Sequence, residues 1–203
     1  MEHPQPDEEL VRRYLSGDAD GFAKLVDRHR RRVYNVCLRI LGDPEDAADA
    51  SQDVFVSLLT KLDQFRGDAA FTTWLHRISV NACYDATRKR RRQPMLHLAD
   101  DRDLPEVEQG PPVPDPAEEV AGTRDVVAAL RRIPEEFRVA LVLADLQDLA
   151  YEQIAKVLDV PIGTVKSRVH RGRVALARAM GLEAREMDAR EPGETAKTSE
   201  EQR

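Results

Sequence analysis

Apolar residues recur every three or four positions through most of the first 92 residues, which is the spacing of helices that bury one face. The pattern breaks at residues 42–44 and again around Gly67. Pro44 suits the first turn of a helix and Asp43 suits its N-cap, so a new helix is expected to begin there. The last such pattern covers residues 71–88. The sequence therefore predicts several packed helices in this region.

A second helical region is expected from about residue 121. It contains a short apolar pattern that begins at Tyr151, a break at Asp159, and a longer pattern from Ile162 onward. A helix, a tight turn and a second helix form the helix-turn-helix motif. Glycine is common in that turn, and Asp159 is expected to supply the same backbone geometry, because aspartate tolerates the left-handed region.

Between these regions, residues 93–120 contain six prolines and eight acidic residues. Proline removes backbone donors and fixes φ, so this stretch is expected to be a flexible acidic linker. Residues 181–203 have few apolar side chains and are expected to be a disordered tail. We therefore expect an all-α chain with two small helical domains, at residues 1–92 and 121–180.

Charge is distributed unevenly along the 203 residues, whose net charge is −6. The expected linker carries −7 and the expected tail −3, whereas residues 1–92 carry +1 and residues 121–180 carry +3. The acidity of the whole chain therefore does not argue against nucleic-acid binding by the two domains.

Several functional classes are disfavoured by what the sequence lacks. No apolar run approaches the roughly 18 residues of a membrane span, and the acidic N-terminus does not resemble a secretion signal, so the expected location is the reducing cytoplasm. Cys37 and Cys83 occupy apolar helical positions and are expected to be buried thiols. No catalytic or metal-binding motif occurs, so we expect no catalytic residue, no metal, no cofactor and no enzyme activity.

The helix from Ile162 to Met180 contains five cations and no acidic residue. Its first turns carry Thr164, Lys166, Ser167 and Arg168, which are residue types that contact bases and phosphates in recognition helices. A solvated helix face is the alternative for such a basic stretch, but the preceding turn and short helix favour DNA binding. The run Arg88–Arg92 could equally bind phosphates or stabilise a helix end.

Other polar and aromatic positions leave alternatives open. Acidic and amide side chains at Asp46, Asp49, Gln52 and Asp53 share a helix face near Phe55 and could dock a basic partner. Phe65 lies in a loop and Trp74 on a helix, and each could be a core residue or could stack on an unpaired base.

These segments together resemble the extracytoplasmic-function (ECF) group of bacterial sigma factors. The resemblance rests on DASQDVF, LDQFRGDAAFTTWLHRISVNACYD and RKRRR in the first domain, and on residues 133–176 in the second. It covers about residues 8–92 and 121–180, in the order and separation that the family shows. The family lacks the middle domain of larger sigma factors, and here the acidic linker takes that place.

The resemblance implies roles for particular residues. It assigns docking on core RNA polymerase to Asp49, Gln52, Asp53 and Phe55. The beta-prime subunit is the implied contact, and the beta subunit is a further partner. It assigns capture and melting of the minus-ten element to a loop and to the helix that follows. The loop covers residues 62–68 and includes Phe65, Arg66 and Gly67. The helix contributes Trp74, Arg77, Asn81, Asp85 and Arg88. It assigns recognition of the minus-thirty-five element to Thr164, Lys166, Ser167, Arg168 and Arg171. Arg173 is expected to bind phosphates.

The implied function is promoter recognition and melting as a dissociable polymerase subunit in stress-responsive transcription, regulated by an anti-sigma factor and without membrane insertion. Ala50 and Ser51 depart from the family, which usually has bulkier apolar residues there, and Asp85 lies where residues vary with promoter choice. The main alternative is a dimeric helix-turn-helix regulator that binds duplex DNA without polymerase. A nucleic-acid-processing enzyme would need a metal or nucleophile constellation that the sequence lacks.

Overall fold

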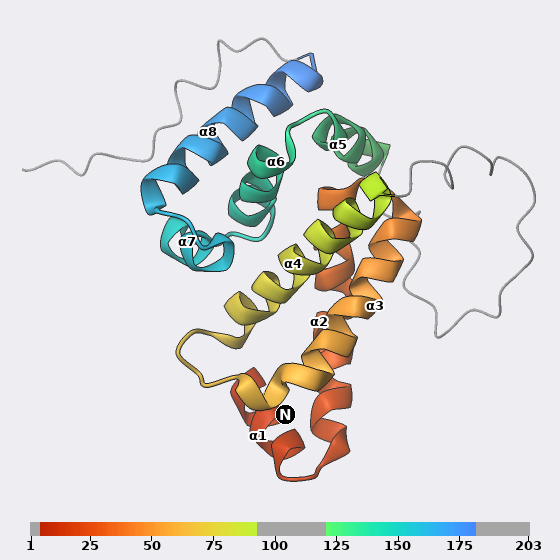
Figure 1. Cartoon of the computed structure of the whole chain (residues 1–203), viewed down its shortest axis with the longest axis vertical. Helices are drawn as coiled ribbons and strands as arrows, with labels where there is room; N and C mark the ends of the chain where they lie inside the picture. Colours follow the sequence, from red (N-terminus) through yellow and green to blue (C-terminus); the bar gives the residue numbers. More distant parts are fainter. Residues whose placement is uncertain (1–4, 93–120, 182–203) are drawn as a thin grey trace, which may run out of the picture.

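The computed structural model describes residues 5–92 and 121–181, and every regular element in those two ranges is helical (Figure 1). The expected all-α class is therefore confirmed. The expected linker and tail lie outside the described residues, apart from Gly181. The elements are α1 (Asp7–Leu15), α2 (Ala19–Leu41), α3 (Pro44–Lys61), the 3-10 turn η1 (Leu62–Gln64), α4 (Phe71–Arg92), α5 (Ala121–Arg131), α6 (Glu135–Leu141), the π-helical turn η3 (Val142–Leu146), α7 (Tyr151–Leu158) and α8 (Ile162–Ala179).

The boundary between α2 and α3 forms where the sequence predicted it. Gly42 ends α2 with a φ of +76°, which is the left-handed conformation that glycine adopts without strain. The carboxylate of Asp43 accepts hydrogen bonds from the backbone N–H groups of Glu45 and Asp46, at 3.0 and 3.2 Å. Pro44 occupies the first turn of α3. The expected N-cap is therefore confirmed.

The first group of helices packs α2, α3 and α4 along one another, with α1 against the first half of α2 (Figure 1). Its core is aliphatic and includes the fully buried Leu25, Val36, Ile40, Val54 and Leu58. Cys37 and Cys83 are also fully buried, which confirms the expectation for both thiols. Burial of this apolar surface is the main stabilising contribution to the three-helix packing.

The second group places α8 directly over α6. A methyl group at Gly172 would lie 2.9 Å from the carbonyl oxygen of Phe137, so the two helices approach more closely there than an alanine would allow. The turn between α7 and α8 contains Asp159 with a φ of +53°. Asp159 therefore supplies the left-handed geometry that the sequence predicted for the helix-turn-helix.

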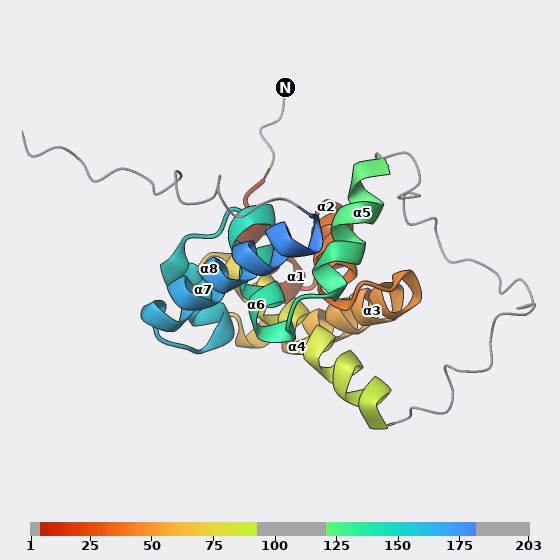
Figure 2. The ribbon, with the colours of Figure 1, turned by 90° about the horizontal axis from the view of Figure 1, so that it is seen from above.

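The two groups also pack against each other, which the sequence patterns did not indicate. Helix α4 lies against α7, and α5 lies beside α2 (Figures 1 and 2). The side chain of Arg131 covers Gly42, and Arg91 Nη2 lies 3.5 Å from Glu135 Oε2. Buried residues of both groups, including Leu75 and Leu143, belong to one continuous apolar cluster.

Candidate functional site

Helix α3 presents an exposed face that is partly acidic and partly apolar. Asp49, Gln52 and Asp53 are exposed, as the sequence predicted for a docking face. Val56 and Leu59 lie on the same side of the helix and are 60% and 46% exposed. These two aliphatic side chains were missed by the sequence reasoning, which named Phe55 as the apolar contact. An exposed apolar patch bordered by charged residues is typical of a protein interface.

Phe55 and Asp46 occupy other positions relative to this face. Phe55 is half-buried and packs against the core of the first group. Asp46 accepts a hydrogen bond from Arg90 Nη1 at 3.2 Å and so connects the start of α3 to the end of α4. The exposed side chains Asp49, Gln52, Asp53, Val56 and Leu59 form the candidate surface that is called the docking face here, and Phe55 and Asp46 lie beside it.

The loop before α4 is anchored by an aromatic cluster. Phe65 packs edge-on against Phe71, with ring centroids 5.6 Å apart, and lies 5.3 Å from Trp74. Phe65 and Trp74 are both half-buried, so each combines a packing contact with an accessible surface. Arg66 and Gly67 are exposed at the tip of the loop, and Gly67 has a φ of +78°.

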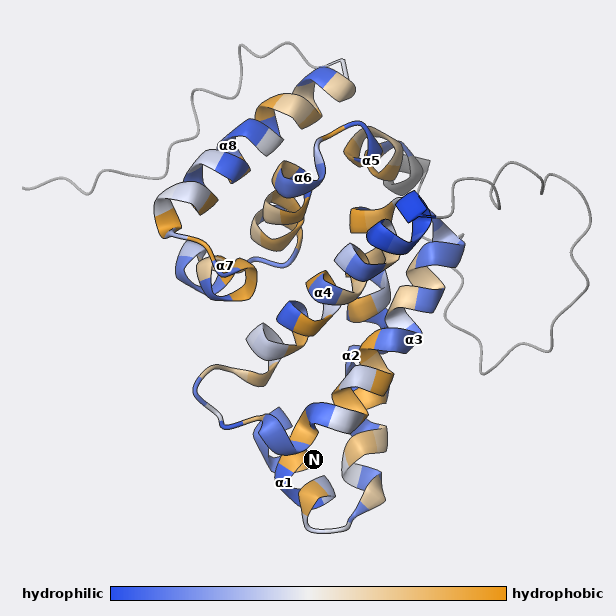
Figure 3. Ribbon diagram, viewed as in Figure 1, coloured by the Kyte–Doolittle hydropathy of each residue, from blue (hydrophilic) through white to orange (hydrophobic). Residues whose placement is uncertain are grey.

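The predicted minus-ten residues of α4 form one exposed stripe beside this cluster. Arg77, Asn81, Asp85 and Arg88 follow one another at intervals of four, four and three residues, and all four are exposed. This spacing places them on one side of the helix. Arg88 forms an ion pair with Asp85. The stripe ends in the strongly hydrophilic last turns of α4, drawn deep blue in Figure 3.

Two buried histidines lie behind this surface. His76 is 5% exposed, and burial lowers its pKa to about 4, with the positive charge of Arg32 acting in the same direction. Burial also lowers the pKa of His29, although its Nε2 lies 2.9 Å from a carboxylate oxygen of Asp7. Both imidazoles are therefore neutral in the folded protein at pH 7.

We expect stability to depend on pH through His76. Its pKa is lower in the folded chain than the unfolded value of about 6.5, so the unfolded chain binds the proton more tightly. The free energy of unfolding should be highest above about pH 6.5 and should fall by about 3 kcal/mol as the pH approaches 4. Urea unfolding of wild type and His76→Gln at several pH values measures this. The difference between the two curves should vary with pH; a constant difference would contradict the assignment to His76.

In the second group, α8 exposes part of the predicted recognition surface. Lys166, Ser167 and Arg171 are exposed, whereas Thr164 is half-buried. His170 is also exposed, one turn after Lys166 and next to Arg171. His170 was not among the residues predicted from the sequence, and its interval of four residues places it on the same side of α8 as Lys166. The recognition face of α8 is defined here as Lys166, Ser167, His170 and Arg171.

Three of the predicted DNA-binding arginines have partners within the second group. Arg173 donates two hydrogen bonds to the carboxylate of Asp145, at 2.7 and 3.0 Å. Arg168 donates to Glu136 at 3.2 Å, and its side chain is only 23% exposed. The guanidinium of Arg171 lies 5.7 Å from the ring centroid of Phe137. Arg173 therefore ties α8 to η3, and Arg168 ties α8 to α6.

Within residues 5–92 and 121–181, no three His, Cys, Asp or Glu side chains gather as metal ligands would. None of the helices in this part of the chain combines the length and apolarity needed to cross a bilayer.

Comparison with known proteins matches both groups of helices. Residues 25–93 match the family model described as Sigma-70 region 2, and residues 123–176 match that described as Sigma-70, region 4. The chain is 38% identical to the ECF RNA polymerase sigma factor SigM of Mycobacterium tuberculosis, over 88% of this chain and 87% of that protein.

Two solved structures share the fold. One is CnrH in complex with the cytosolic domain of CnrY, with a TM-score of 0.64 and 24% identity over 86% of this chain and 97% of that one. The other is the sigma factor RpoE of Bartonella quintana in complex with the anti-sigma factor NepR. Its TM-score is 0.62, with 23% identity over 80% of this chain and 98% of that one.

Proposed function

This chain belongs to the ECF group of sigma-70 RNA polymerase sigma factors and directs core polymerase to promoters, and we propose that it also melts the minus-ten element through α4 and the preceding loop. Within this proposal the chain is a non-catalytic subunit that acts in the cytoplasm, where polymerase and chromosome are found. It binds promoter DNA only as part of the holoenzyme.

The observation that carries the melting proposal is the exposed stripe of α4 beside the aromatic cluster. Extruding a base from a duplex costs a few kcal/mol of stacking and pairing, which contacts to the extruded base must offset. Asn81 offers both a donor and an acceptor to a base edge. Phe65 and Trp74 offer ring surface on which a base can stack, while Arg66, Arg77 and Arg88 offer charge to the DNA backbone.

Permanganate reactivity tests this role, because the reagent oxidises thymines that have lost their stacking. Holoenzyme assembled from this chain and core polymerase should make minus-ten thymines reactive on its own promoter. Arg66→Ala combined with Asn81→Ala should suppress that reactivity and leave footprinting protection of the minus-thirty-five element in place. Full reactivity in the double variant would show that other residues melt the duplex.

Docking on core polymerase is assigned to the docking face of α3, with Phe55 supporting it from the core. The acidic side chains suit a basic partner surface, and Val56 and Leu59 supply apolar area for the centre of an interface. We propose the beta-prime subunit as the partner of this face and the beta subunit as a further contact of the chain.

Recognition of the minus-thirty-five element is assigned to the recognition face of α8 in the major groove, with Thr164, Arg168 and Arg173 beside it. Lys166 and Arg171 are exposed for base or phosphate contacts. Arg168 reaches DNA only after it leaves Glu136, and Arg173 contributes by holding α8 in position through Asp145.

We expect Lys166→Ala to relax specificity at one position of the minus-thirty-five element. Loss of a base contact should cost roughly 1–3 kcal/mol of discrimination. Transcription by the holoenzyme from promoters with every single base change in that element measures the effect. Arg178→Ala is the matched control, because Arg178 is exposed on the last turn of the same helix. A uniform loss across all promoters in Lys166→Ala would instead assign Lys166 to the phosphate backbone.

Regulation by an anti-sigma factor is also proposed. The RpoE neighbour was solved bound to one, and the docking face of this chain exposes aliphatic area that a protein partner would cover. A partner bound there competes with core polymerase. Val56→Asp should therefore weaken both complexes, whereas loss of core binding alone would place the anti-sigma contact elsewhere.

A further inference from the structure

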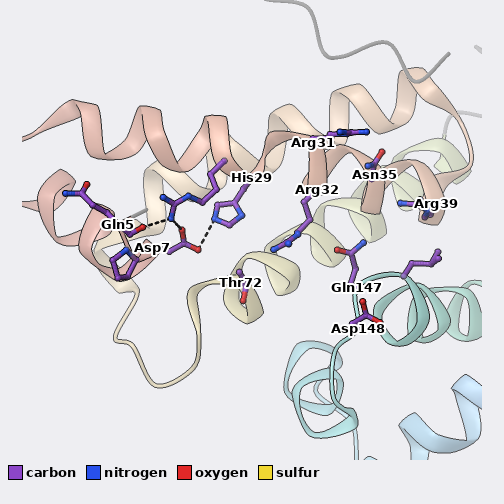
Figure 4. Close-up of a pocket in the computed structure, with 13 residues that line it drawn as sticks. Gln5, Asp7, His29, Arg31, Arg32, Asn35, Arg39, Thr72, Gln147 and Asp148 are labelled. Carbon is purple, nitrogen blue, oxygen red and sulfur yellow. Dashed lines mark hydrogen bonds and ion pairs between the residues drawn. The ribbon is translucent and has the colours of Figure 1, made fainter. Parts of the chain in front are cut away.

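A cavity of about 800 Å³ lies between the two groups of helices, outside every surface assigned above. Helix α2 forms one wall, and Gln147 and Asp148 of the turn after η3 form the opposite wall (Figure 4). The segment before α1 and Thr72 at the start of α4 complete it. The lining of the cavity therefore combines residues of both groups of helices.

The α2 wall is strongly basic. Arg28, Arg31, Arg32 and Arg39 line the cavity together with Asn35, at the spacing of one helix face. The carboxylate of Asp7 is already paired, because it accepts a hydrogen bond from Arg28 Nη1 at 2.6 Å and contacts His29. The remaining carboxylate in the lining is that of Asp148. The lining thus carries an excess of positive charge.

Arg32 is the best placed of these cations for a ligand. Its side chain is exposed and extends from α2 toward Thr72 at the start of α4 (Figure 4). Arg28 is held by Asp7, and Arg31 and Arg39 also have interaction partners within the chain. The positive field of Arg32 reaches the interior, where it helps to lower the pKa of both His29 and His76.

We propose that this cavity binds a small compound that carries a chain of two or three phosphates. Guanidinium groups and a side-chain amide are donors that match phosphate oxygens, and the planar guanidinium fork binds two oxygens at once. The volume lies within the range of about 300–1,000 Å³ that is typical of small-molecule sites. Phosphates of a DNA strand share this chemistry. We commit to a small ligand because the α2 wall and the Gln147–Asp148 turn line the site from two sides, and an oligonucleotide is the competing arm of the test.

Because the two walls come from different groups of helices, ligand binding should favour the packed arrangement. A ligand that contacts both α2 and the Gln147–Asp148 turn binds less tightly when these move apart, so its binding stabilises their contact by linkage. Occupancy would therefore bias how the two DNA-reading groups are held relative to each other.

Calorimetric titration of the full chain with sodium tripolyphosphate, in sodium chloride buffer without divalent metal ions, tests the proposal. We expect saturable binding at one site that is weakened at least about tenfold by Arg32→Ala. Arg30→Ala is the matched control and should leave affinity within about twofold, because Arg30 is exposed on the same helix but does not line the cavity. Circular dichroism and thermal unfolding confirm that each variant is folded.

Two further measurements define the site and its ligand. Tripolyphosphate should raise the pKa of His29 and His76, measured from their imidazole NMR signals, because it offsets the field of Arg32. Adenosine triphosphate should compete with tripolyphosphate, whereas a single-stranded oligonucleotide of about 12 nucleotides should not. Equal losses in Arg30→Ala and Arg32→Ala, unchanged histidine pKa values, or displacement by the oligonucleotide would each overturn the proposal.

Discussion

Substitution of Asp53→Lys together with Val56→Ala should weaken binding to core polymerase by about 100-fold or more. Asp53 and Val56 are exposed side by side on α3, one supplying charge and the other apolar area. Truncation of a central interface residue costs about 2 kcal/mol or more, and a reversed charge adds repulsion. About 2.8 kcal/mol corresponds to a 100-fold change in the dissociation constant. Fluorescence anisotropy of the labelled chain, titrated with purified core, measures it.

A matched control separates this effect from general charge changes. Lys24 is exposed on α2, outside the docking face, and forms an ion pair with Asp20. Lys24→Ala should bind core as wild type does. Because neither substitution on α3 removes a buried side chain, the double variant should keep its thermal unfolding temperature within a few degrees. Wild-type affinity in a folded double variant would remove α3 from the interface.

Asn81→Ala should lower initiation from a fully duplex promoter by about tenfold to a hundredfold. The lost hydrogen bonds to an unpaired base correspond to about 1–3 kcal/mol of the free energy that drives melting. Asn81 is exposed, so the change removes no core packing. On a promoter whose minus-ten strands are mismatched, no base pairs remain to be opened. The defect should then shrink to less than about threefold. Run-off transcription on both templates measures this.

The comparison of the two templates distinguishes melting from placement. A contact that merely positions the duplex would matter equally on both promoters. The same loss on the mismatched template would therefore assign Asn81 to docking of the DNA rather than to strand opening. Lys24→Ala again provides the control and should behave as wild type on both.

Local signals in the sequence predicted much of this structure. Asp43 and Pro44 marked the start of α3 because capping and proline geometry depend only on neighbouring residues. Asp159 marked the turn of the helix-turn-helix for the same reason. The resemblance, and not a local signal, named Arg77, Asn81, Asp85 and Arg88; in the structure they lie on one side of α4 and each of them is exposed.

Contacts between distant segments could not be predicted in this way. The pairs Arg168–Glu136 and Arg173–Asp145 join residues about 30 positions apart, so their formation depends on how α8 crosses α6 and η3. The exposure of Val56 and Leu59 depends on which side of α3 the other helices cover, and an apolar residue in a helical pattern is usually interpreted as core. The cavity beside Arg32 forms only when the two groups pack together.

The central claim is that α4 and α8 recognise a promoter only within the polymerase holoenzyme. Start-site-specific transcription by purified core, with and without this chain, tests it most directly when paired with duplex binding by the free chain. We predict a discrete transcript that requires the chain and both promoter elements, with no specific duplex binding by the chain alone. Tight, sequence-specific duplex binding by a dimer of the free chain, without any core-dependent transcript, would contradict the account and identify a conventional helix-turn-helix regulator.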